Sequence, residues 1–207
     1  TPKPSSAASD VYKRQIDWES ESFHPVVNLP EDYKILDLTK GPWISGDSGF
    51  SIGKYDEFRP NVYNTDLFKS VRNIHVGIDI GGPVGTPCMA FMEGKIFDFG
   101  YNPAAGDYGN VVITEHIISS VKIWSLYGHL DSQSIINKNK GQFIEKGEVI
   151  GFFGDESENG GWEPHLHFQL SVIEPETHDL PGVVSIEDRK SALLKFPDPR
   201  LVLGPIY

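Results

Sequence analysis

Short runs of alternating apolar and polar residues, broken by glycine and proline, constrain the fold of this chain most. The 207 residues include 21 Gly and 15 Pro, so uninterrupted runs stay brief, and Val, Ile and Phe fill many of them. Alternation with a period of two places successive side chains on opposite faces of a strand. We therefore predict many strands and turns, in one domain large enough to bury a core.

The first run of chemical interest spans residues 74–80. Polar or absent side chains (His75, Gly77, Asp79) alternate with β-branched ones, which predicts a half-buried strand. His75 and Asp79 then share a face and flank Gly77, which leaves a gap wide enough for an ion. Imidazole nitrogen together with carboxylate oxygen suits Zn²⁺. The alternative is an exposed polar face that carries an incidental histidine and aspartate.

Two further runs carry histidine. In 165–170, Leu166, Phe168 and Leu170 are expected to enter the core, and His165 and His167 to line the other face. In 123–130, His129 lies between apolar neighbours, and taken alone it is read most simply as a satisfied core histidine. The three runs together favour a shared site over three coincidences.

These residues, in this order, resemble the lysostaphin-like zinc endopeptidases, which cleave peptidoglycan cross-links. The resemblance covers about residues 71–174. It is carried by His75-Val-Gly-Ile-Asp79, Leu126-Tyr-Gly-His129-Leu130, the glycine-marked hairpin 141–154 and Pro164-His-Leu-His-Phe168. It departs from the family's pattern at Gln169, where Glu is common, and in the long acidic loop 155–163.

The resemblance implies an all-β fold, an antiparallel sheet with a barrel-sandwich hybrid core. It also implies one Zn²⁺ per chain, bound by His75, Asp79 and His167, with His129 and His165 as the two unligated catalytic histidines. A catalytic zinc takes three protein ligands and leaves the fourth position for water. Which of His129 and His165 takes the water's proton, and which faces the developing oxyanion, stays open at this point.

Further residues are weaker candidates. His116, Tyr108 and Asn102 are candidate substrate contacts, and a surface or loop role is the simpler alternative for each. Family members often carry an N-terminal segment that shapes the cleft. From such a segment Asp56, Glu57, Arg59 and Asn61 are candidates to reach the site, and Asn61 is the candidate for zinc's open position. Cys88 is expected to pack as a small hydrophobe.

The expected organisation has four parts. Residues 1–15 read like the translation of a sequencing adapter, so they are treated as an artefact or a disordered tail, and the start of the chain says nothing about export. Residues 16–70 form an extension packing on or near the cleft, residues 71–174 the peptidase core, and residues 175–207 a C-terminal extension. The net charge of −11 argues against nucleic acid as a partner, and no apolar run is long enough for a transmembrane segment.

The expected function is zinc-dependent hydrolysis of amide bonds in peptidoglycan cross-link peptides or in another peptide substrate. Such an enzyme acts outside the cytoplasm if its substrate is the wall. Two alternatives stay open: an intracellular hydrolase of small peptides or amides, and a catalytically silent protein that binds wall peptides. The hairpin 141–154 also resembles biotinyl and lipoyl carrier domains, but no lysine stands in the setting that a carrier needs.

Overall fold

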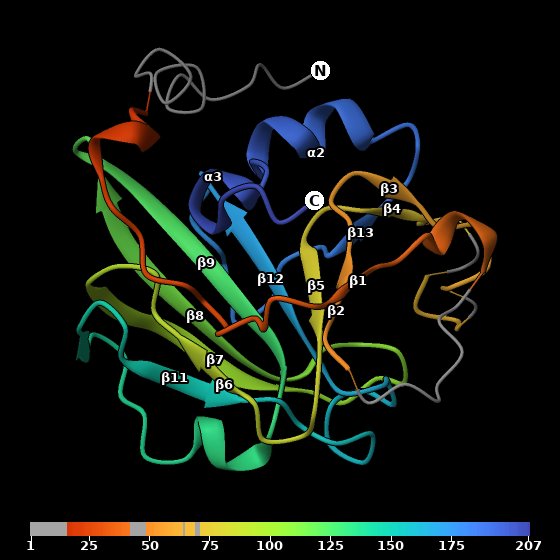
Figure 1. Ribbon diagram of the computed structural model, residues 1–207, viewed down its shortest axis with the longest axis horizontal. Coiled ribbons are helices and arrows are strands. Elements are labelled where there is room, and N and C mark those ends of the chain that lie inside the picture. Colours follow the sequence, from red (N-terminus) through yellow and green to blue (C-terminus); the bar gives the residue numbers. More distant parts are fainter. Residues whose placement is uncertain (1–15, 42–48, 64, 69–70) are drawn as a thin grey trace.

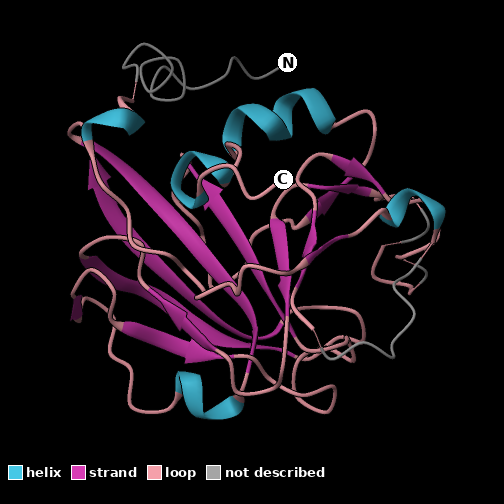
Figure 2. Ribbon diagram, in the orientation of Figure 1, coloured by secondary structure: helices cyan, strands magenta, loops and turns pink. Residues whose placement is uncertain are grey.

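The computed structural model describes residues 16–41, 49–63, 65–68 and 71–207. Strands dominate these residues, as Figure 2 shows, and helices are few and short. The predicted all-β fold is therefore confirmed, whereas the barrel-sandwich detail stays a prediction. The interpretation of residues 1–15 as an adapter or tail lies outside the described residues.

An eight-stranded sheet forms the body of the protein (Figure 1). All its pairings are antiparallel except that of the first two strands, which are parallel. In spatial order its strands are β1 (Lys34–Ile35), β2 (Ser51–Gly53), β5 (Ile78–Gly81), β12 (His165–Ser171), β9 (Val121–Leu130), β8 (Gly109–Ile118), β7 (Gly94–Asn102) and β10 (Phe143–Ile144).

Two small sheets and five short helices complete the described structure. β6 (Pro87–Met89) pairs with β11 (Val149–Phe152), and β4 (Ile74–His75) lies between β13 (Val183–Val184) and β3 (Glu57–Phe58). The helices are the 3₁₀ turns η1 (Trp18–Ser20), η2 (Leu38–Lys40) and η3 (Ser132–Ile135) and the α-helices α2 (Arg189–Lys195) and α3 (Arg200–Leu203). None of the helices in the described ranges has the length and apolarity needed to cross a membrane.

Both faces of the large sheet are covered, each by its own core. Along β8, Val112 belongs to one apolar cluster, whereas Val111 and Ile113 belong to the other, as period-two alternation requires. The first core also holds Leu166, Phe168 and Leu170, as the sequence predicts, and the buried Cys88. The second core is closed by the C-terminal residues Leu180, Val184, Ala192 and Phe196.

The run 74–80 differs from the single half-buried strand that the sequence predicts. The strand breaks after His75, so β4 and β5 join different sheets. The polar face is also more covered than expected: His75 is 1% exposed, because β3 and β13 flank it on both sides, and Asp79 is partly buried. The gap beside Gly77 is filled by the His167 ring, since a Cβ on Gly77 would lie 2.5 Å from two of its ring atoms.

Candidate metal centre

Strand register brings the histidine and aspartate runs together on the second-core face of the sheet. β12 lies between β5 and β9, and His167 is paired with Asp79 on one side and with Gly128 on the other. His165 is two residues from His167 on the same strand, and His129 follows Gly128. The five residues that the family resemblance implies for the site therefore meet at one place.

Three donor atoms converge at this place. The Nε2 atom of His75 lies 3.0 Å from Nδ1 of His167, and each of these nitrogens lies 3.1 Å from Oδ1 of Asp79. Ligand bonds of 2.0–2.1 Å at tetrahedral angles place donor atoms about 3.3 Å apart around Zn²⁺. Among the described residues, His75, Asp79 and His167 form one group whose donor atoms lie close enough together to hold a metal ion.

The hydrogen bonds made by the outward-facing ring nitrogens of His75 and His167 explain why their inward-facing nitrogens carry no proton. Nδ1 of His75 lies 2.9 Å from the carbonyl oxygen of Lys54, and Nε2 of His167 lies 3.0 Å from Oε1 of Gln169. Both partners are acceptors, so each ring donates its proton outward and presents an unprotonated nitrogen to the shared centre. Gln169 thus supplies the acceptor at the position where the family often has Glu. An imidazole pair with one carboxylate is a donor set that Zn²⁺ accepts.

Charge at this centre is fixed by burial and by ion pairs. Burial lowers the pKa of His75 to about 4, so its ring is neutral at pH 7. Burial alone would raise the pKa of Asp79, but His75, which becomes charged only near pH 4, and the permanent charge of Arg59 hold it well below its usual value. Asp79 is therefore a carboxylate, which is the form that binds metal.

His129 and His165 stand beside the three donors with a common arrangement. Their rings are 4.1 Å apart between centroids. Nδ1 of His129 donates to the carbonyl oxygen of Asn159 at 2.7 Å, and Nδ1 of His165 donates to that of Glu163 at 2.6 Å. Burial lowers the pKa of both, that of His129 well below its usual value. Each ring is thus neutral, and its Nε2 is left as a proton acceptor.

The backbone of His129 is strained. Its φ of 63° lies in the left-handed region, which non-glycine residues rarely adopt. Hydrogen bonds hold this conformation on both sides, from the amide of His129 to the Tyr108 carbonyl and from the amide of Gly154 to the His129 carbonyl. Strain of this kind persists where the surrounding structure over-determines it, and it clusters at functional sites.

A cavity of about 590 Å³ opens over these side chains. Its walls come from the segment before β4 (including Tyr63), from Tyr108 and Trp162, and from residues 173–177 and 179–183 after β12. Tyr108 lines it, and its hydroxyl lies 3.5 Å from Nε2 of His167 and donates to the Leu180 carbonyl, while its contact with substrate stays a prediction.

Three of the weaker candidates are not brought to this cavity. Asn102 ends β7, and Asn61 is exposed; neither is among the residues that line the cavity. His116 is on the opposite face of the sheet, where its ring packs 4.3 Å from Phe91 of the first core. The expected substrate contact of His116 is wrong, because even-numbered positions of β8 face the first core.

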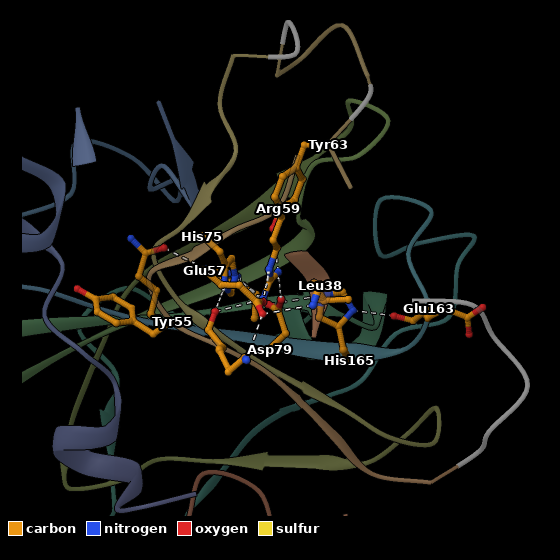
Figure 3. A network of polar contacts seen from close by, with 12 residues as sticks. Leu38, Tyr55, Glu57, Arg59, Tyr63, His75, Asp79, Glu163 and His165 are labelled. Carbon is orange, nitrogen blue, oxygen red and sulfur yellow. Dashed lines mark hydrogen bonds and ion pairs between the residues drawn. The ribbon is translucent and has the colours of Figure 1, made fainter. Parts of the chain in front are cut away.

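Arg59 is one of the four candidates from the N-terminal segment, and the sequence predicts no partner for it. Its guanidinium is 2% exposed and donates from Nη1 to Oδ2 of Asp79 at 2.6 Å (Figure 3). It also donates from Nε to Glu57 at 2.9 Å. An arginine directly after a Glu-Phe pair in a turn-rich segment carries no local signal for this role.

Comparison with known proteins gives the family. A model of Peptidase family M23 matches residues 73–178. The DD-carboxypeptidase/endopeptidase Mpg of Neisseria meningitidis is 35% identical over 99 residues, which are 48% of this chain and 20% of that protein. The peptidoglycan DD-endopeptidase ShyA of Vibrio cholerae is 34% identical over 98 residues, 47% of this chain and 20% of that protein. The chain thus spans about a fifth of the length of these curated relatives.

A solved structure is similar as well. The catalytic domain of lysostaphin from Staphylococcus simulans aligns with 75% of this chain and 93% of that domain, at 25% identity and a TM-score of 0.49. The family match covers just over half of the 207 residues. It contains all three inward-facing donors as well as His129 and His165. The chain belongs to peptidase family M23.

Proposed function

We propose that this chain is the catalytic part of a zinc-dependent endopeptidase that hydrolyses amide bonds in peptidoglycan cross-link peptides. The observation that carries the proposal is the convergence of three unprotonated donor atoms at 3.0–3.1 Å. Beside them lie the rings of His129 and His165, whose Nε2 atoms are available as proton acceptors. The similarity to ShyA, a peptidoglycan DD-endopeptidase, and to Mpg, a DD-carboxypeptidase/endopeptidase, supports this substrate class. An enzyme acting on the wall works outside the cytoplasm.

His75, Asp79 and His167 would hold the ion. When bound, Zn²⁺ acidifies a water molecule and polarises the scissile carbonyl. The one carboxylate leaves the site with a charge of +1, which favours an oxyanion. Gln169 and the Lys54 carbonyl keep the two ligand rings in the required tautomer and orientation.

His129 and His165 would move the protons. Both are neutral, so either Nε2 can take the water's proton, and the ring that takes it becomes the donor that the leaving amine needs. The Nε2 of His165 lies 3.9 Å from Oδ1 of Asp79. The backbone carbonyls at Asn159 and Glu163 hold both rings in place and stabilise their protonated state through the Nδ1 hydrogen bond.

A silent wall-binding protein is disfavoured, because such proteins typically lack a ligand and here the full set converges. The cavity of about 590 Å³ is of the size that binds small ligands, so an unrelated short peptide is a second candidate substrate. The test is therefore digestion of intact sacculi, defined cross-linked wall peptides and unrelated short peptides, each with and without a zinc chelator, followed by mass spectrometry of the products.

We expect cleavage of cross-linked wall peptides that stops with chelator and returns with added Zn²⁺. His167→Ala is the matched inactive control, because it removes one donor atom and leaves the fold's cores intact. Chelator-resistant cleavage, or cleavage by His167→Ala at the wild-type rate, would disprove the zinc mechanism. Cleavage of the unrelated peptides alone would move the substrate away from the wall.

A further inference from the structure

The two oxygens of Asp79 have different partners. Oδ1 lies 3.1 Å from His75 Nε2 and from His167 Nδ1, so it faces the shared centre. Oδ2 accepts a hydrogen bond from Nη1 of Arg59 at 2.6 Å, on the other side of the carboxylate. Figure 3 shows Arg59 between Tyr63 and Asp79.

Arg59 is itself held at several points. Its Nε donates to Glu57 at 2.9 Å, its Nη1 also donates to the Tyr63 hydroxyl at 2.9 Å, and its Nη2 donates to the Lys54 carbonyl at 3.2 Å. A planar guanidinium fixed along three edges cannot rotate away from its carboxylate. Arg59 is therefore a rigid support for Oδ2 rather than a flexible surface charge.

Space for this support is provided by Gly53. The register of β2 and β5 pairs Gly53 with Asp79. A Cβ at Gly53 would lie 2.8 Å from Nη2 of Arg59 and 3.2 Å from Oδ2 of Asp79. The guanidinium thus lies where any side chain at Gly53 would project, and it reaches Asp79 because that position has none.

Glu57 balances the charge of the support. Glu57 is 5% exposed. Its Oε2 accepts a hydrogen bond from Arg59, and its Oε1 accepts one from the Leu38 amide at 3.3 Å. Glu57, which also lies 3.6 Å from Nζ of Lys54, offsets part of the charge of Arg59, so Asp79 keeps part of its negative charge for a cation. Glu57 and Arg59 both precede the region matched by the family model, residues 73–178.

We propose that Arg59 is a positioning residue that restricts Asp79 to one metal-facing oxygen. This role rests on the zinc site proposed above. Because Oδ2 is held by Arg59, Asp79 supplies a single donor atom, and the fourth position at the metal stays available for water. The segment 54–63 thereby sets the coordination number of a site whose ligands all come from the matched region.

The test uses Arg59→Met, which keeps the length and bulk of the side chain and removes its donors. Zinc affinity is measured by competition with a chromophoric chelator, and coordination by the visible absorption of the Co²⁺-substituted protein. We expect about 10- to 100-fold weaker zinc binding. We also expect weaker Co²⁺ absorption, which marks a change from four toward five ligands as Oδ2 becomes free. Arg59→Lys restores the charge without the planar fork and should recover part of the affinity.

Arg189→Met is the matched control. Arg189 is also an arginine bonded to an aspartate, with Nε 2.7 Å from Oδ1 of Asp56, but it touches no ligand. Its zinc affinity and Co²⁺ spectrum should equal those of the wild type. If Arg59→Met does not fold because the buried Glu57 loses its arginine partner, the double variant Glu57→Gln with Arg59→Met removes that buried charge, and the same loss of zinc affinity is expected.

The outcomes separate the two proposals. If the wild type binds no zinc, or if His167→Ala binds zinc as tightly as the wild type does, the zinc site is overturned, and the proposed peptidase function with it. If the wild type binds zinc and His167→Ala does not, a folded Arg59→Met or double variant with wild-type affinity and spectrum overturns only the role of Arg59.

Discussion

Two buried histidine clusters lie on opposite faces of the same sheet, and they differ in how their ring nitrogens are used. In the metal cluster (His75, Asp79, His167), each histidine donates outward, and two nitrogens and one oxygen face each other. In the His116 cluster (Thr114, His116, Ser125), Nδ1 faces the Glu93 carbonyl at 2.9 Å and Nε2 faces the Thr114 hydroxyl at 2.7 Å.

The comparison shows that burial alone does not mark a metal site. His75 and His116 are both 1% exposed, and burial lowers the pKa of each to about 4. His116 has a partner for both nitrogens within the protein, and the Thr114 hydroxyl continues to Ser125 at 2.6 Å. At the metal cluster, the inward lone pairs of His75, His167 and Asp79 face one another and no hydrogen-bond donor among the described residues. A bound cation is the partner that satisfies them.

The largest effect that the comparison predicts is at His167. Replacing His167 by Ala removes one of three donors, so bound zinc and peptidase activity should both fall to background. Metal analysis after gel filtration measures the first and peptide cleavage the second. Stoichiometric zinc in the folded His167→Ala protein would contradict the ligand assignment. His116→Ala, which alters the other cluster, should keep its zinc.

A smaller and more selective effect is expected at the two unligated rings. His129→Ala and His165→Ala should each retain stoichiometric zinc, while the rate of peptide cleavage falls by about 10²- to 10⁴-fold, the usual contribution of a positioned acid or base. The separation of zinc content from rate is the point of this test. Loss of zinc from either variant would place that ring among the ligands.

Gln169 sharpens the comparison further, because it orients a ligand without touching the centre. Gln169→Leu removes the acceptor for Nε2 of His167 and leaves a buried ring proton without a partner. We expect zinc affinity to fall by about 10- to 100-fold. Gln169→Glu restores an acceptor and should recover the affinity. Equal affinities for wild type and Gln169→Leu would show that the Tyr108 hydroxyl, 3.5 Å away, suffices.

The smallest effect concerns the His116 cluster and is one of stability. The pKa of His116 is about 4 in the folded protein and about 6.5 when unfolded. The unfolded state therefore binds more protons between these values, so stability is complete above pH 6.5 and is lost as the pH falls toward 4. One group accounts for at most roughly 3 kcal/mol of this loss.

The free energy of unfolding, measured against pH with chelator present, checks this sign. The wild type should lose stability below pH 6.5 more steeply than His116→Gln, which cannot titrate. Parallel curves for the two proteins would contradict the assigned shift. Activity at pH 7 should be the same in both, since His116 does not line the cavity.

Alternation in the sequence predicts well on which face of a strand a side chain lies. It predicts less well where a strand begins or ends. It placed Leu166, Phe168 and Leu170 in a core and put His165 and His167 on the other face, because the side-chain period of a strand is local. It could not show that the chain breaks after His75, which depends on β3 and β13 pairing with β4 from distant parts of the sequence.

His116 and Arg59 show the same limit from two sides. The sequence makes His116 a candidate substrate contact, but the face of β8 on which it lies is fixed by register with β9. Arg59 could not be chosen over Asp56 or Asn61, because its contact with Asp79 depends on the fold of a segment 20 residues away in sequence. The face of His116 and the contact of Arg59 both depend on pairing between distant segments, which a local residue pattern does not reveal.

The three-stranded sheet around His75 has a consequence for how this protein can be dissected. β4 carries the ligand, while β3 comes from before the family match and β13 from after it. A fragment cut to residues 73–178 would leave β4 with two bare edges and would lose Arg59 together with the residues that close the second core. The inherited module is thus smaller than the cooperative folding unit, and grafting the module alone into another protein should yield an insoluble product.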